Sequence, residues 1–209
     1  MRKIFAASLL FAAAVPVLAQ MPTTPPGAKD KSRVTAGSYT VDPHHTQILF
    51  KVNHLGFNNY FGIFGNATGS LTIDPAKPAA AKVEISVPIS GLVTTSSALT
   101  EHLMKPEFFD SAKFATATFK STSIVVDKDG DEAKITGNLT IKGVTKVVVL
   151  DAEFEGAGIM PNPAGKQQTI GFSAETTIKR SDFGVSYGIP LVPDEVPLKI
   201  TVAFERPAA

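Results

Sequence analysis

Apolar residues fall on every second position along much of this chain, and this period constrains the fold more than any other feature. In residues 46–53 apolar side chains recur at every second position, Ile48, Phe50 and Val52, and the other face carries the polar Gln47, Lys51 and Asn53. A period of two is typical of a β-strand that buries one face. The same alternation returns in seven further segments, at residues 61–74, 81–89, 113–126, 133–141, 145–155, 169–180 and 195–205.

The eight segments predict an all-β fold made of long antiparallel strands. The first two strands and the break between them are also rich in glycine, at Gly56, Gly62, Gly65 and Gly69. Glycine lets strands bend strongly without side-chain clashes, which favours a closed barrel over an open sheet. The interior of an eight-stranded barrel is either filled by its own side chains or holds one small ligand. The alternation alone leaves that choice open.

One stretch between the third and fourth strands has a helical pattern instead. Ser96 or Ser97 can cap a helix in which Leu99 and Leu103 share one face, and Pro106 ends the run. We therefore predict one short helix in an otherwise all-β chain.

Two adjacent phenylalanines, Phe108 and Phe109, follow this helix in a predicted tight helical turn over residues 106–110. We expect at least one of the two rings to fill a space in the fold. The helix and the turn together span residues 97–110, and they are well placed to act as a lid at one end of the barrel.

The start of the chain predicts export. Arg2 and Lys3 precede an apolar run that ends in small residues, which is typical of a cleaved signal peptide over residues 1–19. The run is shorter than the roughly 20 apolar residues of a membrane-spanning helix. Residues 20–37 are rich in proline and polar side chains and predict a flexible linker. Residues 38–207 are expected to form a single barrel domain.

The overall charge points to no strongly charged partner. Twenty basic and nineteen acidic residues are scattered without runs, so we expect no nucleic-acid binding. The chain has no cysteine, and therefore neither disulfides nor thiol chemistry can contribute. The barrel interior is the more informative place to look for function.

Sequence signatures of catalysis and metal binding are few. The chain has no G-x-S-x-G, P-loop or H-E-x-x-H motif, and we expect no catalytic residue and no metal site. The remaining alternative is a metal-binding or hydrolytic enzyme that uses His45, His54 and His102. His45 and His54 differ in parity, so a regular strand would point them to opposite faces. The acidic residues at 127–131 favour a plain hairpin turn over a calcium loop.

A different alternative is an outer-membrane barrel, for which eight strands and a signal peptide are also expected. Such barrels carry aromatic girdles at both membrane interfaces, whereas this chain has no tryptophan and three tyrosines. We therefore expect a protein that is not integral to a membrane.

Fourteen phenylalanines are the most suggestive feature of the composition. Such residues form either a packed core or an apolar lining around a slot, and a ligand for that slot would be a lipid tail. His54 shares the parity of Phe50 and Val52 and should face the interior near the end of its strand. It is either a structural residue of the rim or a contact for the polar head of a ligand.

Several strings of residues resemble the YceI-like family of exported bacterial proteins, and they occur in family order along the chain. His45 matches the histidine of the opening motif, and Thr46 stands where the family usually has serine. The matching strings are residues 39–45, 50–56, 62–64, 102–103, 107–110, 137–146 and 180–184.

The resemblance implies an extended eight-stranded antiparallel lipocalin-like barrel. Its long lumen would hold an isoprenoid quinone-like molecule or another long-chain amphiphile, either a polyisoprenoid or a fatty-acid-type lipid. The implied protein is a non-catalytic carrier, store or sequestering protein of the periplasm. Transient contact with a membrane and association of two barrels as a homodimer are left open.

For the ligand site we predict residues from the inward faces of the strands, from the lid and from the loop after the seventh strand. Arg180 and Asp182 in that loop are expected to form an ion pair in preference to contacting a head group. The predicted ligand-binding residues are Ile48, Phe50, Val52, His54, Phe64, Leu103, Phe108, Phe109, Phe119, Phe172, Arg180, Asp182 and Phe183.

Overall fold

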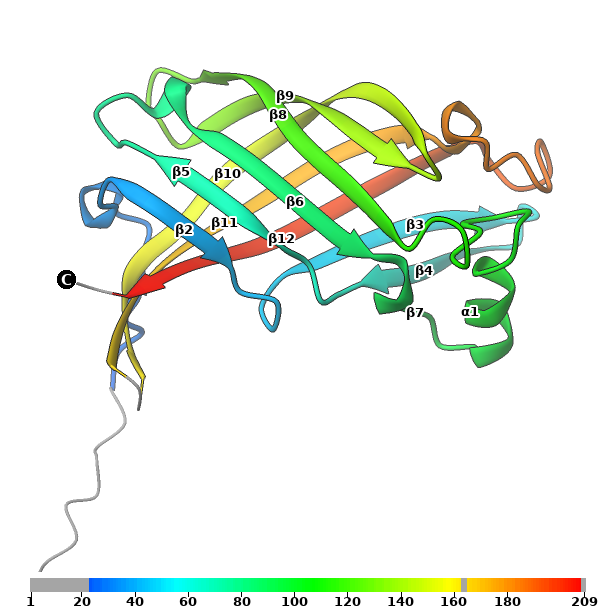
Figure 1. Ribbon diagram of the computed structural model, residues 1–209, viewed down its shortest axis with the longest axis horizontal. Coiled ribbons are helices and arrows are strands. Elements are labelled where there is room, and N and C mark those ends of the chain that lie inside the picture. Colours follow the sequence, from blue (N-terminus) through cyan, green and yellow to red (C-terminus); the bar gives the residue numbers. More distant parts are fainter. Residues whose placement is uncertain (1–22, 163–164, 208–209) are drawn as a thin grey trace, which may run out of the picture.

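The computed structural model describes residues 23–162 and 165–207, and within them an antiparallel barrel is closed by eight strands (Figure 1). Each strand pairs with the next, and the last pairs with the first, so the predicted eight-stranded barrel is confirmed. The strands in order around the barrel are β2 (Gly37–Val41), β5 (Thr68–Ile73), β6 (Lys82–Pro88), β8 (Thr116–Val126), β9 (Glu132–Ile141), β10 (Val144–Asn162), β11 (Gly165–Lys179) and β12 (Glu195–Pro207).

At one end the wall is lengthened by β3 (Gln47–His54) and β4 (Asn58–Phe64), which form a hairpin. β3 pairs with β12 farther along the same edge that β2 occupies. The segment 61–74 was expected to be one strand, and this is wrong because β4 and β5 are separate. Asn66 between them has a φ of 58°, in the left-handed region that interrupts a strand.

β10 and β11 extend farther than their sequence indicates. The proline and glycine content of residues 156–165 predicts a loop, but in the described part the hairpin pairing continues as far as Asn162 and Gly165. Residues 163 and 164 lie outside the described residues. The glycines serve close approach instead, because the short strand β1 (Gly27–Ala28) lies against them. A Cβ atom at Gly158 would lie 2.2 Å from the carbonyl oxygen of Pro26.

The described part of the predicted flexible linker is structured. β1 is followed by the 3₁₀ helix η1 (Lys31–Arg33), which Asp30 caps by accepting a bond from the Ser32 amide. The side-chain amide of Gln168 donates to the carbonyl oxygen of Arg33 at 2.9 Å. We call residues 26–34 the N-terminal strap. The predicted signal peptide lies outside the described residues.

The predicted helix is confirmed as α1 (Ser97–Leu103), and the Ser96 hydroxyl accepts a bond from the Leu99 amide. It follows the two-residue strand β7 (Leu92–Val93) and lies beside the β3–β4 end of the barrel (Figure 1). None of its residues is buried. The remaining 3₁₀ helices are η2 (Pro78–Ala80), η3 (Ile89–Gly91) and η4 (Arg180–Phe183).

The buried side chains form two clusters near the two ends of β12. Tyr39, Ile170 and Phe204 belong to the cluster nearer the strap, which gives the strap end of the barrel. Phe183 and Val196 belong to the other cluster, at what we call the α1 end. No helix in the described ranges has the length and apolar character needed to cross a bilayer.

Candidate functional site

The barrel is hollow between its two buried clusters. Inward-facing side chains surround a cavity of about 1280 Å³ that reaches from the strap end to the α1 end. This volume exceeds the roughly 300–1,000 Å³ of a pocket for a drug-sized ligand. The lumen is therefore large enough for a long-chain molecule.

Two phenylalanines lie against glycines of the neighbouring strand. A Cβ atom at Gly62 would lie 2.3 Å from the ring of Phe50, and one at Gly137 would lie 2.4 Å from the ring of Phe119. Each ring thus occupies the space that a side chain on the adjacent strand would fill. This arrangement places bulky residues along the wall and leaves space nearer the axis.

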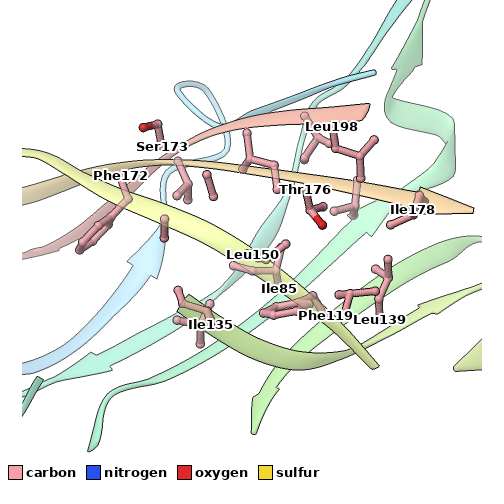
Figure 2. Close-up of a pocket in the computed structure, with 18 of the residues that line it drawn as sticks. Ile85, Phe119, Ile135, Leu139, Leu150, Phe172, Ser173, Thr176, Ile178 and Leu198 are labelled. Atoms are coloured by element: carbon pink, nitrogen blue, oxygen red, sulfur yellow. The ribbon is translucent and has the colours of Figure 1, made fainter. Parts of the chain in front are cut away.

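The lining of the central section is almost entirely apolar (Figure 2). Thr176 contributes a hydroxyl, but that hydroxyl donates to the carbonyl oxygen of Val149 at 2.9 Å and is therefore satisfied by the wall. The other labelled side chains that line this section include Ile85, Phe119, Ile135, Leu139, Leu150 and Leu198.

Twelve of the thirteen predicted ligand-binding residues line the cavity. The exception is Asp182, which is exposed and does not line the cavity. Those that do are Ile48, Phe50, Val52, His54, Phe64, Leu103, Phe108, Phe109, Phe119, Phe172, Arg180 and Phe183. Their contact with a ligand stays a prediction.

Arg180 forms no ion pair with Asp182, so that expectation is wrong. Its guanidinium donates four hydrogen bonds of 2.8–2.9 Å to the carbonyl oxygens of Val185, Tyr187, Val192 and Pro193. Burial lowers the pKa of Arg180. The side chain is therefore a structural centre for the loop at residues 184–194.

Asp194 fixes the start of this loop from the other side. Its carboxylate accepts bonds from the Ser181 hydroxyl at 2.7 Å and from the Ser181 amide at 2.8 Å. These bonds, with a smaller contribution from the charge of Arg180, lower the pKa of Asp194. The carboxylate that fixes this loop is therefore that of Asp194 and not, as predicted, that of Asp182. Local sequence spacing could not indicate this, because Asp194 lies 13 residues after Ser181.

At the α1 end, aromatic rings join residues 97–110 to the 184–194 loop. The ring of His102 lies 5.0 Å from that of Phe108 and 5.8 Å from that of Tyr187, edge to face in both cases. His102 is also within hydrogen-bond distance of the Glu107 carboxylate, at 3.1 Å. Phe109 packs edge-on against Phe64, with centroids 5.4 Å apart. Both rings of the paired turn line the cavity, and the expectation that one of them fills a space stays a prediction.

Several lining residues at this end are absent from the predicted site. Asn58, Tyr60, Tyr187 and Val192 all line the cavity. The Tyr60 hydroxyl lies 3.0 Å from the hydroxyl of Thr95, just before α1. Asn58 and Tyr60 have the even parity of Gly62 and Phe64 and could have been found from it, whereas the 184–194 loop has no periodicity to indicate its orientation.

The strap end of the lumen is covered by the N-terminal strap and the β8–β9 turn. Lys31 lies 2.9 Å from the Asp131 carboxylate and also contacts the carbonyl oxygen of Asp129. Lys31, Ser32 and Val34 all line the cavity. The segment that was expected to be a linker therefore forms part of the site.

The histidines of the enzyme alternative lie at opposite ends of β3. His45 is bonded to the buried carboxylate of Asp42, whereas His54 and His102 line the α1 end of the cavity. An eight-residue strand separates its ends by more than 20 Å. Within residues 23–162 and 165–207, no three His, Asp or Glu side chains are grouped so that they could hold a metal ion.

The His45–Asp42 pair has a defined electrostatic effect. The side-chain bond with Asp42 raises the pKa of His45. Burial disfavours ionisation of Asp42, but bonds from His45 and from the His44 amide together hold the pKa of Asp42 below its usual value. Burial, with the nearby charge of Asp42, raises the pKa of Glu205. This group lies outside the lumen-lining set and joins the start of the barrel to its end.

Comparisons with known proteins agree on one family. The model of the YceI-like domain matches residues 39–204. Protein YceI of Salmonella arizonae is 39% identical over 169 residues, which cover 80% of this chain and 86% of that protein. The crystal structure of the Campylobacter jejuni YCEI protein has a TM-score of 0.62 at 32% identity and covers 75% of this chain and 90% of its own.

A more distant likeness concerns the fold alone. A polyisoprenoid-binding domain from Saccharophagus degradans, implicated in plant cell wall breakdown, has a TM-score of 0.59 at 15% identity. The match covers 81% of this chain and 98% of that domain.

Proposed function

This chain belongs to the YceI-like family, and from that premise we propose that it binds one long-chain isoprenoid lipid in its lumen as a carrier or sequestering protein. The supporting observation is the hollow, apolar lumen of about 1280 Å³. Each methylene group that enters such a space gains about 0.8 kcal/mol. A long tail therefore binds tightly without many polar contacts. The Saccharophagus degradans domain shares this fold, and the proposal rests on the lumen itself.

The α1 end favours a ligand whose head is polar but uncharged. Arg180 is the cation that lines this end, and four of its five donors already bond carbonyl oxygens. The lysines that line the cavity, Lys31 and Lys128, belong to the strap end. The side chains of His54 and Asn58 also line this end and offer hydrogen bonds. A quinone or an alcohol fits these groups better than a carboxylate or a phosphate, which would lack a counter-charge.

We further propose that the protein works in the periplasm and without catalysis. The predicted signal peptide at residues 1–19 supports export. An apolar lumen suits sequestration because isoprenoid tails dissolve poorly in water. The lining offers hydrogen bonds for orientation, and the enzyme alternative would need His45 and His54 together although β3 separates them.

The proposal is tested by extracting lipids from protein purified from the periplasm and identifying them by mass spectrometry. We expect about one isoprenoid per protein molecule. Ala174→Trp places an indole in the lumen, because Ala174 lines the cavity. Thr177→Trp is the matched control, since Thr177 is exposed on the same strand. We expect the first variant to lose at least nine-tenths of the lipid and the second to keep it.

A second blocking variant, Ala133→Trp, keeps the test decisive if Ala174→Trp does not fold. Ala133 lines the same cavity from β9. Wild-type protein without any extractable lipid, or equal lipid content in folded blocking and control variants, would overturn the proposal.

A further inference from the structure

Two loops at the α1 end carry strongly exposed apolar side chains. Phe57, in the turn between β3 and β4, is 86% exposed, and Leu191, in the 184–194 loop, is 70% exposed. Both loops project from the same end of the barrel's long axis (Figure 1). We call Phe57 and Leu191, with the exposed Leu55 and Tyr187 beside them, the apolar tips.

The two loops that carry the tips also contain no acidic or basic residue of the types Asp, Glu, Lys and Arg. No Asp, Glu, Lys or Arg occurs between Lys51 and Asp74, or between Asp182 and Asp194. Exposed apolar side chains are common singly, but two uncharged apolar turns at one end of a protein indicate a contact surface.

The tips adjoin the α1 end of the lumen. His54 and Asn58 lie on either side of Phe57 in the sequence, and both line the cavity. Tyr187 and Val192 lie on either side of Leu191, and both also line the cavity. A lipid that enters at this end therefore passes between apolar surfaces that face solvent.

We propose that the apolar tips insert into the surface of a lipid bilayer, so that the mouth of the lumen opens directly onto the membrane. This inference rests on the proposed function and extends it by naming the partner from which the lipid comes. An isoprenoid tail then moves between two apolar environments without crossing water.

The shape of the surface favours a bilayer over a protein partner. Stable protein interfaces bury about 800 Å² on each side with complementary shapes. Two separate turn tips offer less area, and a bilayer needs no matching surface. Aromatic and aliphatic side chains such as Phe57 and Leu191 are those that enter the boundary between head groups and acyl chains.

The test is flotation of delipidated protein with vesicles of phosphatidylethanolamine and phosphatidylglycerol that contain no isoprenoid. The test variant is Phe57→Ser combined with Leu191→Ser, and neither residue lines the lumen. The matched control is Val125→Ser, because Val125 is 64% exposed on β8 and lies beside the β8–β9 turn at the strap end. We expect the double variant to bind vesicles at least tenfold more weakly and the control to bind like wild type.

Equal vesicle binding by wild type and the double variant, or an equal loss in Val125→Ser, would overturn the inference. Sedimentation velocity provides the competing outcome: a wild-type dimer that the double variant abolishes would mean that a second copy covers the tips. Because the vesicles carry no isoprenoid, membrane binding is measured separately from lumen occupancy. Protein that carries extracted lipid but never floats would refute the membrane contact and leave the proposed function standing.

Discussion

At the scale of single residues, the width of the lumen depends on which side chains lie along the wall. Phe50 lies over Gly62 and Phe119 lies over Gly137. In each pair the missing side chain of the glycine gives the ring a place beside the strand. Without that place the ring would have to move, and the space available to it is the lumen.

We therefore predict that Gly62→Val destabilises the protein and narrows the lumen. The new side chain overlaps the Phe50 ring, and overpacking of this kind costs about 1–3 kcal/mol. Urea unfolding measures the loss, and Gly65→Ala is the control because a Cβ atom there meets nothing within 4 Å. Equal stability of Gly62→Val and wild type would show that the wall yields without cost.

The pair of His45 and Asp42 predicts a pH dependence of stability. The pKa of His45 is raised from 6.5, so its charged form is favoured by folding. This contribution is complete below pH 6.5 and is lost as the pH rises through the higher folded-state value. The pKa of Asp42 is lowered from 3.8, so its contribution is lost as the pH falls through the still lower folded-state value.

The measurement is the urea midpoint of wild type and His45→Gln between pH 5 and 9, a range that spans roughly two units about an ordinary histidine pKa. We expect the advantage of wild type to be largest at the acidic side and to shrink toward the alkaline side. His44→Gln is the control, since the His44 ring makes no hydrogen bond in the described part of the chain. An advantage that grows with pH would contradict the assignment.

Inward-facing residues on strands were predictable, whereas the contacts that organise the 184–194 loop were not. Alternation with period two identified the inward faces, and the seven predicted residues that lie on strands all line the cavity. The prediction for Asp182 failed because its loop is organised by Arg180 and Asp194, whose side chains also bond residues 12 or 13 positions away. Sequence parity carries no information about such contacts.

At the scale of elements, α1 is held by its cap more than by its packing. None of its residues is buried, and the Ser96 hydroxyl accepts the Leu99 amide at 3.3 Å. Thr94 and Thr100 add a side-chain bond of 2.9 Å across the first turn. The helix is therefore expected to open locally while the barrel stays closed.

We predict that Ser96→Ala weakens α1 without weakening the barrel. Loss of an N-cap costs about 1 kcal/mol, which corresponds to roughly fivefold faster amide exchange in the helix. Ser97→Ala is the control because Ser97 is exposed and its hydroxyl makes no hydrogen bond in the described ranges. If the free energy of global unfolding falls by the same amount, α1 opens only together with the whole barrel, and its predicted role as a lid is refuted.

The eight-stranded barrel and the single α-helix were predicted correctly, but β1, β2 and β7 were not among the predicted segments, and three boundaries were wrong. The break at Asn66 depends on one left-handed residue, which alternation cannot reveal. The long arms of β10 and β11 contain glycines that suggest a loop, yet Gly156 and Gly158 make room for β1. The strap has too few apolar residues for its ordered structure to be predicted from the sequence. Polar bonds such as those of Lys31 hold it in place instead.

At the scale of the whole molecule, a hollow barrel gives up the contacts that side chains would make in a filled core. A bound lipid restores them, so stability is expected to depend on occupancy. The more of this cavity of about 1280 Å³ a lipid fills, the larger the expected gain in stability.

We predict that protein delipidated in guanidinium and refolded is less stable than protein as purified. Reloading with an isoprenoid quinone should restore about 2.7 kcal/mol at a ligand concentration of 100 Kd. Thermal unfolding at fixed protein concentration measures the change. A long-chain fatty acid should restore less, because Arg180 has no free pair of donors for its carboxylate. Equal stability of empty and loaded protein would contradict the link between the lumen and a ligand.

The order of pairing around the barrel also decides when the protein can hold anything. β12 is the last strand of the chain, yet it pairs with β2 and β3 at the beginning as well as with β11. Until residues 195–207 are in place, the interior is open to solvent along a lengthwise gap, and such distant pairings form late in folding. A shortened chain that lacks this strand therefore cannot retain a lipid, however well its remaining strands associate.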